Sequence, residues 1–235
     1  MDIRSPFIVI DKPKGITSFG VIHKLRKITG IKKIGHTGTL DPLASGVLIC
    51  AIGRESTKQI GNFLDADKSY KALIRLGATS ASYDLETEII HRGVFFLRIP
   101  SKNKIKKVCE VFLGDFFQTP PIYSAKKIKG KKYYDLARAG IEFTPKAKEI
   151  NIKKIEIVKY RWPFLEIIVE CSSGTYIRSL ANDIGEKLKV GGVLCELERI
   201  AVDTITIFDT HKLDDVTPNN WKEKIFKKNH KYILT

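Results

Sequence analysis

Two segments of this chain alternate apolar and polar side chains with the two-residue period of a β-strand. Apolar side chains stand at every second position of residues 70–76 and of residues 165–171, with Glu166 and Glu170 between them in the second segment. A period of two places one row of side chains on each face of a strand, so we expect both segments to lie half-exposed in a sheet. Short apolar runs at 7–10 and 47–52 predict two buried strands.

Segments with a helical period lie between these strands. Apolar residues at positions 21, 22, 25 and 28 share one face of a helix, which Ser18 can cap and Gly30 can end. Further helices are expected after Ser101, over Tyr133–Arg138 and over 177–188, and further strands over 151–159, 193–201 and 203–208. Because strands and helices do not alternate strictly, this order favours an α+β fold with a mixed sheet.

The charge of the chain indicates the kind of partner it meets. The 41 Lys and Arg residues outnumber the 26 Asp and Glu residues and give a net charge of +15. This excess favours an anionic partner, with nucleic acid ahead of a membrane surface because no basic amphipathic helix is evident. Lysine enrichment without a binding role is the alternative that composition leaves open. The longest apolar run, 47–52, is far shorter than the ~18–20 residues that a membrane-spanning helix needs.

The first residues and the cysteines bear on the compartment. Residues 1–6 lack the charged, then apolar, then small-residue order of a secretion signal, so we expect a cytoplasmic protein. Four cysteines lie far apart with no Cys-x-x-Cys pair: Cys50, Cys109, Cys171 and Cys195. Their spacing favours reduced thiols over a disulfide framework or a zinc site. We therefore expect no metal.

The least ordinary stretch is the glycine-rich segment 35–46, which contains Asp41. Its glycines permit backbone angles that other residues avoid, and Pro42 biases Asp41 away from the helical region, so the loop can hold one carboxylate still. An Asx-turn or a helix cap made by Asp41 is the structural alternative. The segment lacks the Gly-Lys-Ser/Thr ending of a phosphate-binding loop, which disfavours nucleotide hydrolysis. His36 is a possible base, ligand or RNA contact, but a lone histidine in a loop is more often only a hydrogen-bonded surface residue.

A cluster of cations follows later in the chain. Five lysines lie between positions 126 and 132 and are flanked by Tyr123, Tyr133 and Tyr134. Cations that neutralise phosphates beside rings that stack on bases suit an RNA-contacting loop, although a solvated run of charge gives the same pattern. Tyr176 and Arg178 stand at an expected strand-to-helix junction, where a core-edge ring and a surface ion pair are the common alternatives.

Five motifs taken together resemble a known family. They are Asp11-Lys12-Pro13-Lys14-Gly15-Ile16-Thr17-Ser18, Gly35-His36-Thr37-Gly38-Thr39-Leu40-Asp41-Pro42, Lys68-Ser69-Tyr70-Lys71, Pro121-Ile122-Tyr123-Ser124-Ala125-Lys126 and Gly174-Thr175-Tyr176-Ile177-Arg178. In order and approximate spacing they resemble the bacterial tRNA pseudouridine-55 synthases, the TruB family. The resemblance implies an α+β pseudouridine synthase fold, with a mixed, largely antiparallel sheet flanked by helices and an RNA-gripping insertion at about 116–148.

The resemblance also implies an activity: an isomerase that flips a uridine out of the T-arm loop of tRNA, at position 55, and converts it to pseudouridine. Asp41 takes the place of the catalytic aspartate. Arg178 would pair with Asp41 and favour its ionised form, and Tyr70 would stack on the uracil and serve in proton removal from C5. His36 would occupy the space among the displaced bases, while Tyr176 and Leu197 would line the pocket. No redox step occurs, so no cofactor is expected.

Some features depart from the family pattern. The family commonly has Thr-Asp-Thr-x-Asp where this chain has residues 79–84, so the role of that loop is left open. The residues after Leu213 are too few for the RNA-binding PUA domain that many members carry. We therefore expect a catalytic domain at 1–213 and a short basic tail at 214–235, in a monomer that needs no protein partner and no membrane.

Two further hypotheses remain beside the tRNA isomerase. The first is an RNA-binding or tRNA-folding module in which catalysis is incidental. The second is a guide-RNA-dependent synthase related to the archaeal and eukaryotic enzymes, against which the missing PUA domain argues.

Overall fold

The structure of the chain, a computed structural model, describes residues 6–93, 99–124, 126–128 and 130–226, with the backbone alone for Lys127, Lys132 and Arg138. The chain forms two compact units. Unit 1 comprises Met1–Tyr70 and Leu197–Thr235, and unit 2 comprises Lys71–Glu196. Two strands run from one unit into the other, β4 (Lys68–Leu76) and β12 (Gly192–Val202).

Unit 1 is built on strand β1 (Phe7–Lys12) and strand β3 (Ala44–Ile52), which pair antiparallel with Ile10 opposite Leu48. On its other side β1 pairs parallel with β14 (His211–Lys212). Strand β2 (Ile34–His36) pairs antiparallel with β3. Strand β3 also pairs parallel with residues 197–199 of β12. Strand β13 (Ile205–Thr206) continues antiparallel from β12. The strand expected over 203–208 is therefore shorter, and helix η2 (Ile207–Asp209) follows it.

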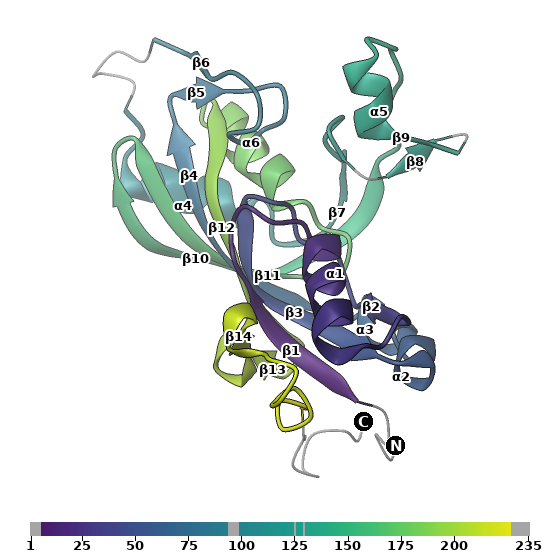
Figure 1. Cartoon of the computed structure of the whole chain (residues 1–235). Helices are drawn as coiled ribbons and strands as arrows, with labels where there is room; N and C mark the ends of the chain where they lie inside the picture. Colours follow the sequence, from purple (N-terminus) through teal and green to yellow (C-terminus); the bar gives the residue numbers. More distant parts are fainter. Residues whose placement is uncertain (1–5, 94–98, 125, 129, 227–235) are drawn as a thin grey trace. The chain divides into compact units, whose positions relative to one another are not determined.

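Helix α1 (Ser18–Thr29) lies along β1 and β3 (Figure 1). The apolar stripe expected from the sequence is confirmed: Val21, Ile22 and Leu25 are buried in one cluster with side chains of β1 and β3. Gly30 ends the helix with a φ of 71°. The helix is capped by Thr17, whose side chain accepts from the Gly20 amide, and not by Ser18 as expected, because the Ser18 hydroxyl bonds to Leu40 instead.

The remaining elements of unit 1 close its two apolar clusters. Helices α2 (Arg54–Lys58) and α3 (Gly61–Leu64) follow β3, and η3 (Leu213–Asp215) follows β14. Part of the expected basic tail packs here, since Val216 is buried with the α1 cluster and Trp221 and Ile225 lie against it. Residues 227–235 of that tail lie outside the described part of the chain.

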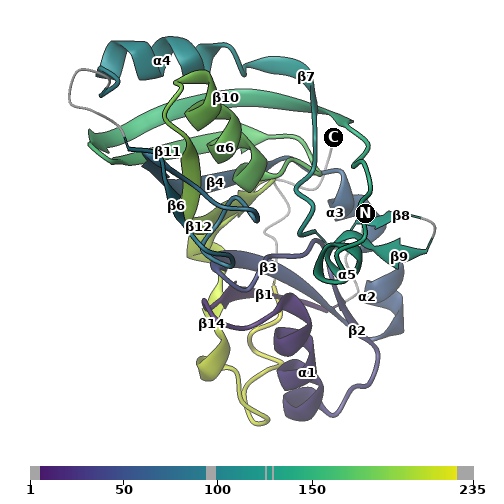
Figure 2. The same cartoon turned by 90° about the horizontal axis from the view of Figure 1, so that it is seen from above.

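Unit 2 holds the strand order β4-β11-β10-β7, formed with β11 (Phe164–Cys171), β10 (Lys148–Arg161) and β7 (Gly114–Gln118). Strand β10 pairs antiparallel with both β11 and β7. The expected alternation in β11 is confirmed, because its four alternate apolar side chains are wholly buried: Leu165, Ile167, Val169 and Cys171. Helix α4 (Lys102–Glu110), capped by Ser101, lies on β10 and contacts α6 (Ile177–Lys187), as Figure 2 shows.

The chain between β7 and β10 projects as a separate small substructure (Figure 1). It contains the hairpin β8 (Lys127–Ile128) and β9 (Lys131–Lys132), followed by α5 (Tyr133–Arg138). The ring of Tyr133 packs on Phe143 with centroids 4.7 Å apart. This substructure occupies the range expected for the insertion. A second hairpin joins β5 (Ala78–Thr79) to β6 (Ile90–His91).

No helix in the described ranges is long and apolar enough to cross a membrane. All four cysteines are free thiols, and three of them are buried: Cys50, Cys109 and Cys171.

Candidate active site

Asp41 lies half-buried on the short loop between β2 and β3, and backbone bonds hold this loop in unit 1. The buried Ser18 hydroxyl donates to the Leu40 carbonyl over 3.0 Å and accepts from the Leu40 amide over 2.8 Å. The Gly15 amide donates to Pro42, and the Ala44 amide donates to the Asp41 carbonyl. Because the residues on both sides of Asp41 are tied down, its carboxylate projects from a fixed backbone.

The side chain of Arg199 holds the two ends of the same loop through hydrogen bonds. Its side chain is 1% exposed, its Nε donates to the Val47 carbonyl over 2.8 Å, and its Nη2 donates to the Gly38 carbonyl over 3.2 Å. Gly46 lies opposite Arg199 in the parallel pairing of β3 with β12 and has a φ of +101°. A Cβ atom at Gly46 would lie 2.3 Å from the Arg199 carbonyl oxygen, so only glycine allows the two strands to come this close.

Lys12 adds a second buried cation. It ends β1 with no exposed surface, and its Nζ donates to the carbonyls of Pro13 and Ile16 over 2.9 and 2.7 Å. Burial lowers the pKa of Lys12 to about 8, and the neighbouring Asp41 carboxylate acts in the opposite direction. Two buried basic side chains, Lys12 and Arg199, therefore adjoin the Asp41 loop within unit 1.

His36 ends β2 and is half-buried; it is therefore a strand residue and not part of an irregular loop. Its Nδ1 accepts from the Gly38 amide over 3.4 Å. Burial, and then the positive charge of Arg199, lower the pKa of His36 below its usual value. Both effects favour the neutral form of the imidazole.

Two further expected residues are buried in the strands of unit 1. Tyr70 on β4 is 8% exposed, and Leu197 on β12 is 7% exposed. Leu197 lies in register with Ala44, three residues after Asp41. An apolar side chain at this position can exclude water from chemistry at the Asp41 loop.

The other two expected residues lie in unit 2, where Arg178 is fixed by a buried ion pair. Its Nη1 lies 3.2 Å from Oδ2 of Asp84, and the two side chains are 5% and 1% exposed. The same guanidinium donates to the carbonyls of Ser82 and Tyr123. Asp84 Oδ1 accepts from the Ser82 hydroxyl over 2.6 Å and from the Glu86 amide over 2.9 Å. Arg178 thus joins the 79–84 loop to the start of α6 and to the insertion.

Tyr176 immediately precedes α6 and is held through its backbone. The Gln118 side chain accepts from the Tyr176 amide over 2.8 Å and donates to the Tyr176 carbonyl over 3.0 Å. Ser179 in the first turn of α6 donates to the Thr119 carbonyl. The junction that carries Tyr176 and Arg178 is therefore locked to the end of β7, where the insertion begins.

The comparison with known proteins decides the family. A sequence model described as TruB family pseudouridylate synthase (N terminal domain) matches residues 26–177, which is more than half of the chain. The chain belongs to the TruB family. A Chlamydia pneumoniae protein named tRNA pseudouridine synthase B is 39% identical over 225 residues, covering 93% of this chain and 94% of that protein. An Endomicrobium trichonymphae protein of the same name is 41% identical over 222 residues, with 94% of each chain covered.

A solved structure confirms the expected fold class. A chain in a crystal structure titled as a Cbf5-Nop10-Gar1 complex matches with a TM-score of 0.72 and 29% identity over 96% of this chain. This chain spans only 58% of the length of that chain. The fold is the pseudouridine synthase fold, with a mixed, mostly antiparallel sheet and helices.

Three buried charged residues beside the expected site residues are not predicted from the sequence: Lys12, Asp84 and Arg199. Lys12 belongs to the first of the five motifs, and Asp84 ends the 79–84 loop. No local pattern distinguishes a buried charge from a surface one. The only signal for Lys12 and Arg199 was that each adjoins an apolar strand segment, and for Asp84 it was the acidic residue in the corresponding family loop.

The insertion of this TruB family member concentrates positive charge. Lys126 Nζ donates to the Lys146 carbonyl over 3.2 Å, and burial together with the charge of Lys148 lowers the pKa of Lys126. Lys131, the first residue of β9, is exposed. Of the expected lysine cluster, Lys129 lies outside the described residues.

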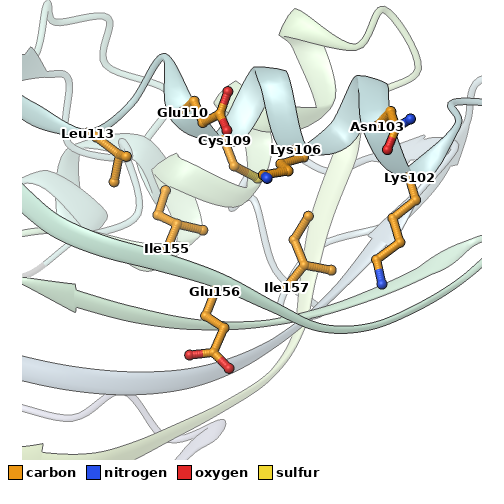
Figure 3. A pocket seen from close by; sticks show the side chains of 9 residues that line it. All are labelled: Lys102, Asn103, Lys106, Cys109, Glu110, Leu113, Ile155, Glu156 and Ile157. Atoms are coloured by element: carbon orange, nitrogen blue, oxygen red, sulfur yellow. The ribbon is translucent and has the colours of Figure 1, made fainter.

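A cavity of about 390 Å³ lies between α4 and β10 in unit 2. Figure 3 shows Ile155 and Ile157 pointing from β10 towards α4, while Glu156 points away. None of the expected site residues lines this cavity, so it is separate from the candidate active site. Among the described residues, no group of three His, Cys, Asp or Glu side chains is placed to hold a metal ion.

Proposed function

We propose that the protein converts uridine to pseudouridine at position 55, in the T-arm loop of tRNA. Membership of the TruB family and the shared name of relatives that it matches over nearly their whole length support this activity. The observation that carries the proposal is the fixed backbone that presents Asp41: Ser18 holds Leu40, Gly15 holds Pro42, and the Ala44 amide holds the Asp41 carbonyl. A single immobile carboxylate is the group that this isomerisation needs.

The reaction exchanges one glycosidic bond for another. The C1′–N1 bond breaks, the uracil turns, and a C1′–C5 bond forms; the proton on C5 is lost and N1 gains one. Atoms balance within the nucleotide, and no electrons are added or removed. Asp41 acts by attack on C6 of the uracil, by attack on C1′ of the ribose, or by stabilising a glycal-type intermediate.

Tyr70 and Arg178 assist this carboxylate in the proposal. Tyr70 stacks on the uracil, and its phenol group takes part in removing the C5 proton once the new bond has formed. Arg178 pairs with Asp41 and favours its ionised form. Asp84 supports this role because its carboxylate fixes the position of the Arg178 guanidinium.

The substrate uridine lies inside a folded RNA loop, so the enzyme extracts it and compensates for the lost stacking. His36 takes space among the displaced bases, and Tyr176 and Leu197 form pocket walls that exclude water. The lysines of the insertion, Lys126 and Lys131 among them, bind phosphates of the T-arm. A cytoplasmic monomer that needs no cofactor and no protein partner completes the proposal.

The test is the isosteric variant Asp41→Asn. With a T-arm hairpin that carries tritium at C5 of uridine, wild-type protein releases tritium, whereas Asp41→Asn binds the hairpin and releases none. Asp65→Asn serves as the control, because Asp65 is an exposed aspartate of the same unit at the end of α3. If Asp41→Asn still turned over the hairpin, the assignment of Asp41 as the catalytic residue would be wrong.

A second arm uses purified protein and bare tRNA. Pseudouridine formation without any added RNA supports a stand-alone enzyme. Activity that appears only with a guide RNA would instead place the protein with the guide-dependent synthases, and tRNA folding that is unaffected by Asp41→Asn would favour the RNA-folding hypothesis.

A further inference from the structure

The outer face of α1 carries an exposed aromatic ring followed by cations. Phe19, in the first turn, is 62% exposed, and His23 and Lys27 are exposed at four-residue intervals after it. Residues four apart lie on the same face of a helix, and eight residues span about 12 Å. We call these residues, together with Arg26, the α1 stripe; α1 is labelled in Figure 1.

The ring of Phe19 is held but not covered. The Arg26 guanidinium lies over it at 5.4 Å from the ring centroid, and Nη2 of Arg26 donates to the Ile34 carbonyl at the start of β2. Arg26 is therefore anchored to the unit 1 sheet and fixes the ring from one side. An exposed ring already fixed in place is a stacking platform, because ordering it on binding costs little entropy.

The cations at the other end of the helix are not neutralised internally. Lys27, Lys32 and Lys33 are exposed and make no ion pair within the described part of the chain. Lys24, one residue outside the stripe, differs because its ammonium pairs with Asp214. The positive charge thus concentrates at the end of α1 and in the turn that leads into β2.

The stripe begins beside the catalytic loop. Phe19 directly follows Ser18, whose hydroxyl both donates to and accepts from Leu40, the residue before Asp41. The exposed face of α1 therefore starts at the end of the helix that is bonded to the Asp41 loop, with Phe19 in the first turn and Lys27 about 12 Å further along the helix. A stacking ring followed by exposed cations is a pattern that binds a nucleic-acid strand.

We propose that the α1 stripe, together with Lys32 and Lys33 after the helix, is a second RNA-binding site. It takes the strand leading away from the modified uridine: an unpaired base stacks on Phe19, and the following phosphates meet Lys27, Lys32 and Lys33. This inference rests on the proposed function, since the RNA is its substrate. It assigns the stripe to affinity for the substrate, while the bond exchange stays with Asp41.

The stacking part is tested with two variants of the exposed ring. Phe19→Leu keeps an apolar side chain but loses the aromatic ring, whereas Phe19→Trp keeps an aromatic ring with a larger π-face. Since a stacked base is worth ~1–3 kcal/mol, Phe19→Leu is expected to raise the Kd for unmodified tRNA by roughly tenfold, and Phe19→Trp to keep it near the wild-type value. In steady-state assays the change appears in kcat/KM far more than in kcat. Equal affinity of wild type and Phe19→Leu overturns the stacking role.

The charge part is tested by salt dependence. Lys27→Glu is expected to weaken tRNA binding and to flatten the plot of log Kd against log salt by about one phosphate contact. The matched control is Lys104→Glu, which makes the same charge change at an exposed lysine of α4, where a glutamate three residues after the Ser101 cap favours the helix. Equal weakening by both variants would mean a general loss of charge and would overturn the site.

These results separate the inference from the proposed function. If the wild type releases tritium and the α1 variants bind tRNA as tightly as the wild type, the second RNA-binding site is overturned and the proposed function stands. Absence of tritium release by wild type on tRNA and on hairpins removes the proposed function, whatever the α1 variants do.

Discussion

Lys12 is a cation that folding removes from water, and this has a consequence for pH. Burial lowers the pKa of Lys12 to about 8, against 10.5 in an exposed lysine. Between these two pH values the unfolded chain holds the proton and the folded protein has lost it. The contribution of Lys12 to the free energy of unfolding therefore rises by up to roughly 3 kcal/mol as the pH increases from about 8 to 10.5.

The measurement compares wild type with Lys12→Met, whose side chain has a similar length and no charge. Urea unfolding at several pH values between 7.5 and 10 is expected to show the wild type gaining stability relative to Lys12→Met as pH rises. Other titrating groups are common to both proteins and cancel in the difference. A difference that does not change with pH would mean that the Lys12 ammonium is solvated in the folded state.

At the residue scale, the sequence supports a prediction for one carboxylate, Asp41, but not for the buried charges near it. Asp41 stands out because glycines and Pro42 constrain its loop, and this signal is local. The burial of Lys12 and Arg199 and the Arg178–Asp84 ion pair depend on residues far away in the chain. Pairing at such distances follows from the fold and leaves no trace in spacing. The expected contact of Arg178 with Asp41 stays a prediction.

At the element scale, the close approach of the paired strands β3 and β12 depends on Gly46. A methyl group there would need both a strained φ of +101° and a shift of the Arg199 backbone, which would be 2.3 Å away. Gly46→Ala is therefore expected to lower the free energy of unfolding by ~3 kcal/mol or more, because backbone cannot move aside as a side chain can.

Gly15→Ala is the matched control for this prediction. Gly15 has a similar φ of +89°, but nothing lies within 4 Å of its added Cβ. This variant is expected to cost only the backbone strain, about 1–2 kcal/mol. The comparison uses denaturant unfolding at one temperature, and equal losses in the two variants would show that the strands can separate without penalty.

The elements themselves were largely predictable, and the misses have physical reasons. Apolar periodicity located α1 and α4, and α5 has the predicted bounds, because each period is a local property of the chain. Strand β2 was missed because three residues rich in glycine and histidine carry no strand signal; its bonds come from β3. Thr17 displaced Ser18 as the helix cap because a distant partner, Leu40, takes the Ser18 hydroxyl.

At the scale of the whole molecule, the net charge of +15 is the property that a salt titration measures. Exposed cations occur in both units, at the end of α1 and in the insertion. Each phosphate that a lysine neutralises releases a counterion, so log Kd rises with log salt in proportion to the number of such contacts. With six or more contacts, the affinity for tRNA is expected to fall by about 10³-fold between 50 and 200 mM salt.

The placement of charge matters more than its sum, and two double variants separate these effects. Lys126→Ala with Lys131→Ala removes two cations from the insertion, and Lys104→Ala with Lys107→Ala removes two exposed cations from α4 in the same unit. The insertion pair is expected to flatten the salt slope by about 1.4 to 1.8, since each contact contributes ~0.7 on a single strand and ~0.9 on a duplex, while the α4 pair leaves it unchanged. Identical slopes for the two double variants would mean that tRNA responds only to the net charge. A flatter slope for the insertion pair alone would show that the excess of lysine is arranged for binding, which composition by itself leaves undecided.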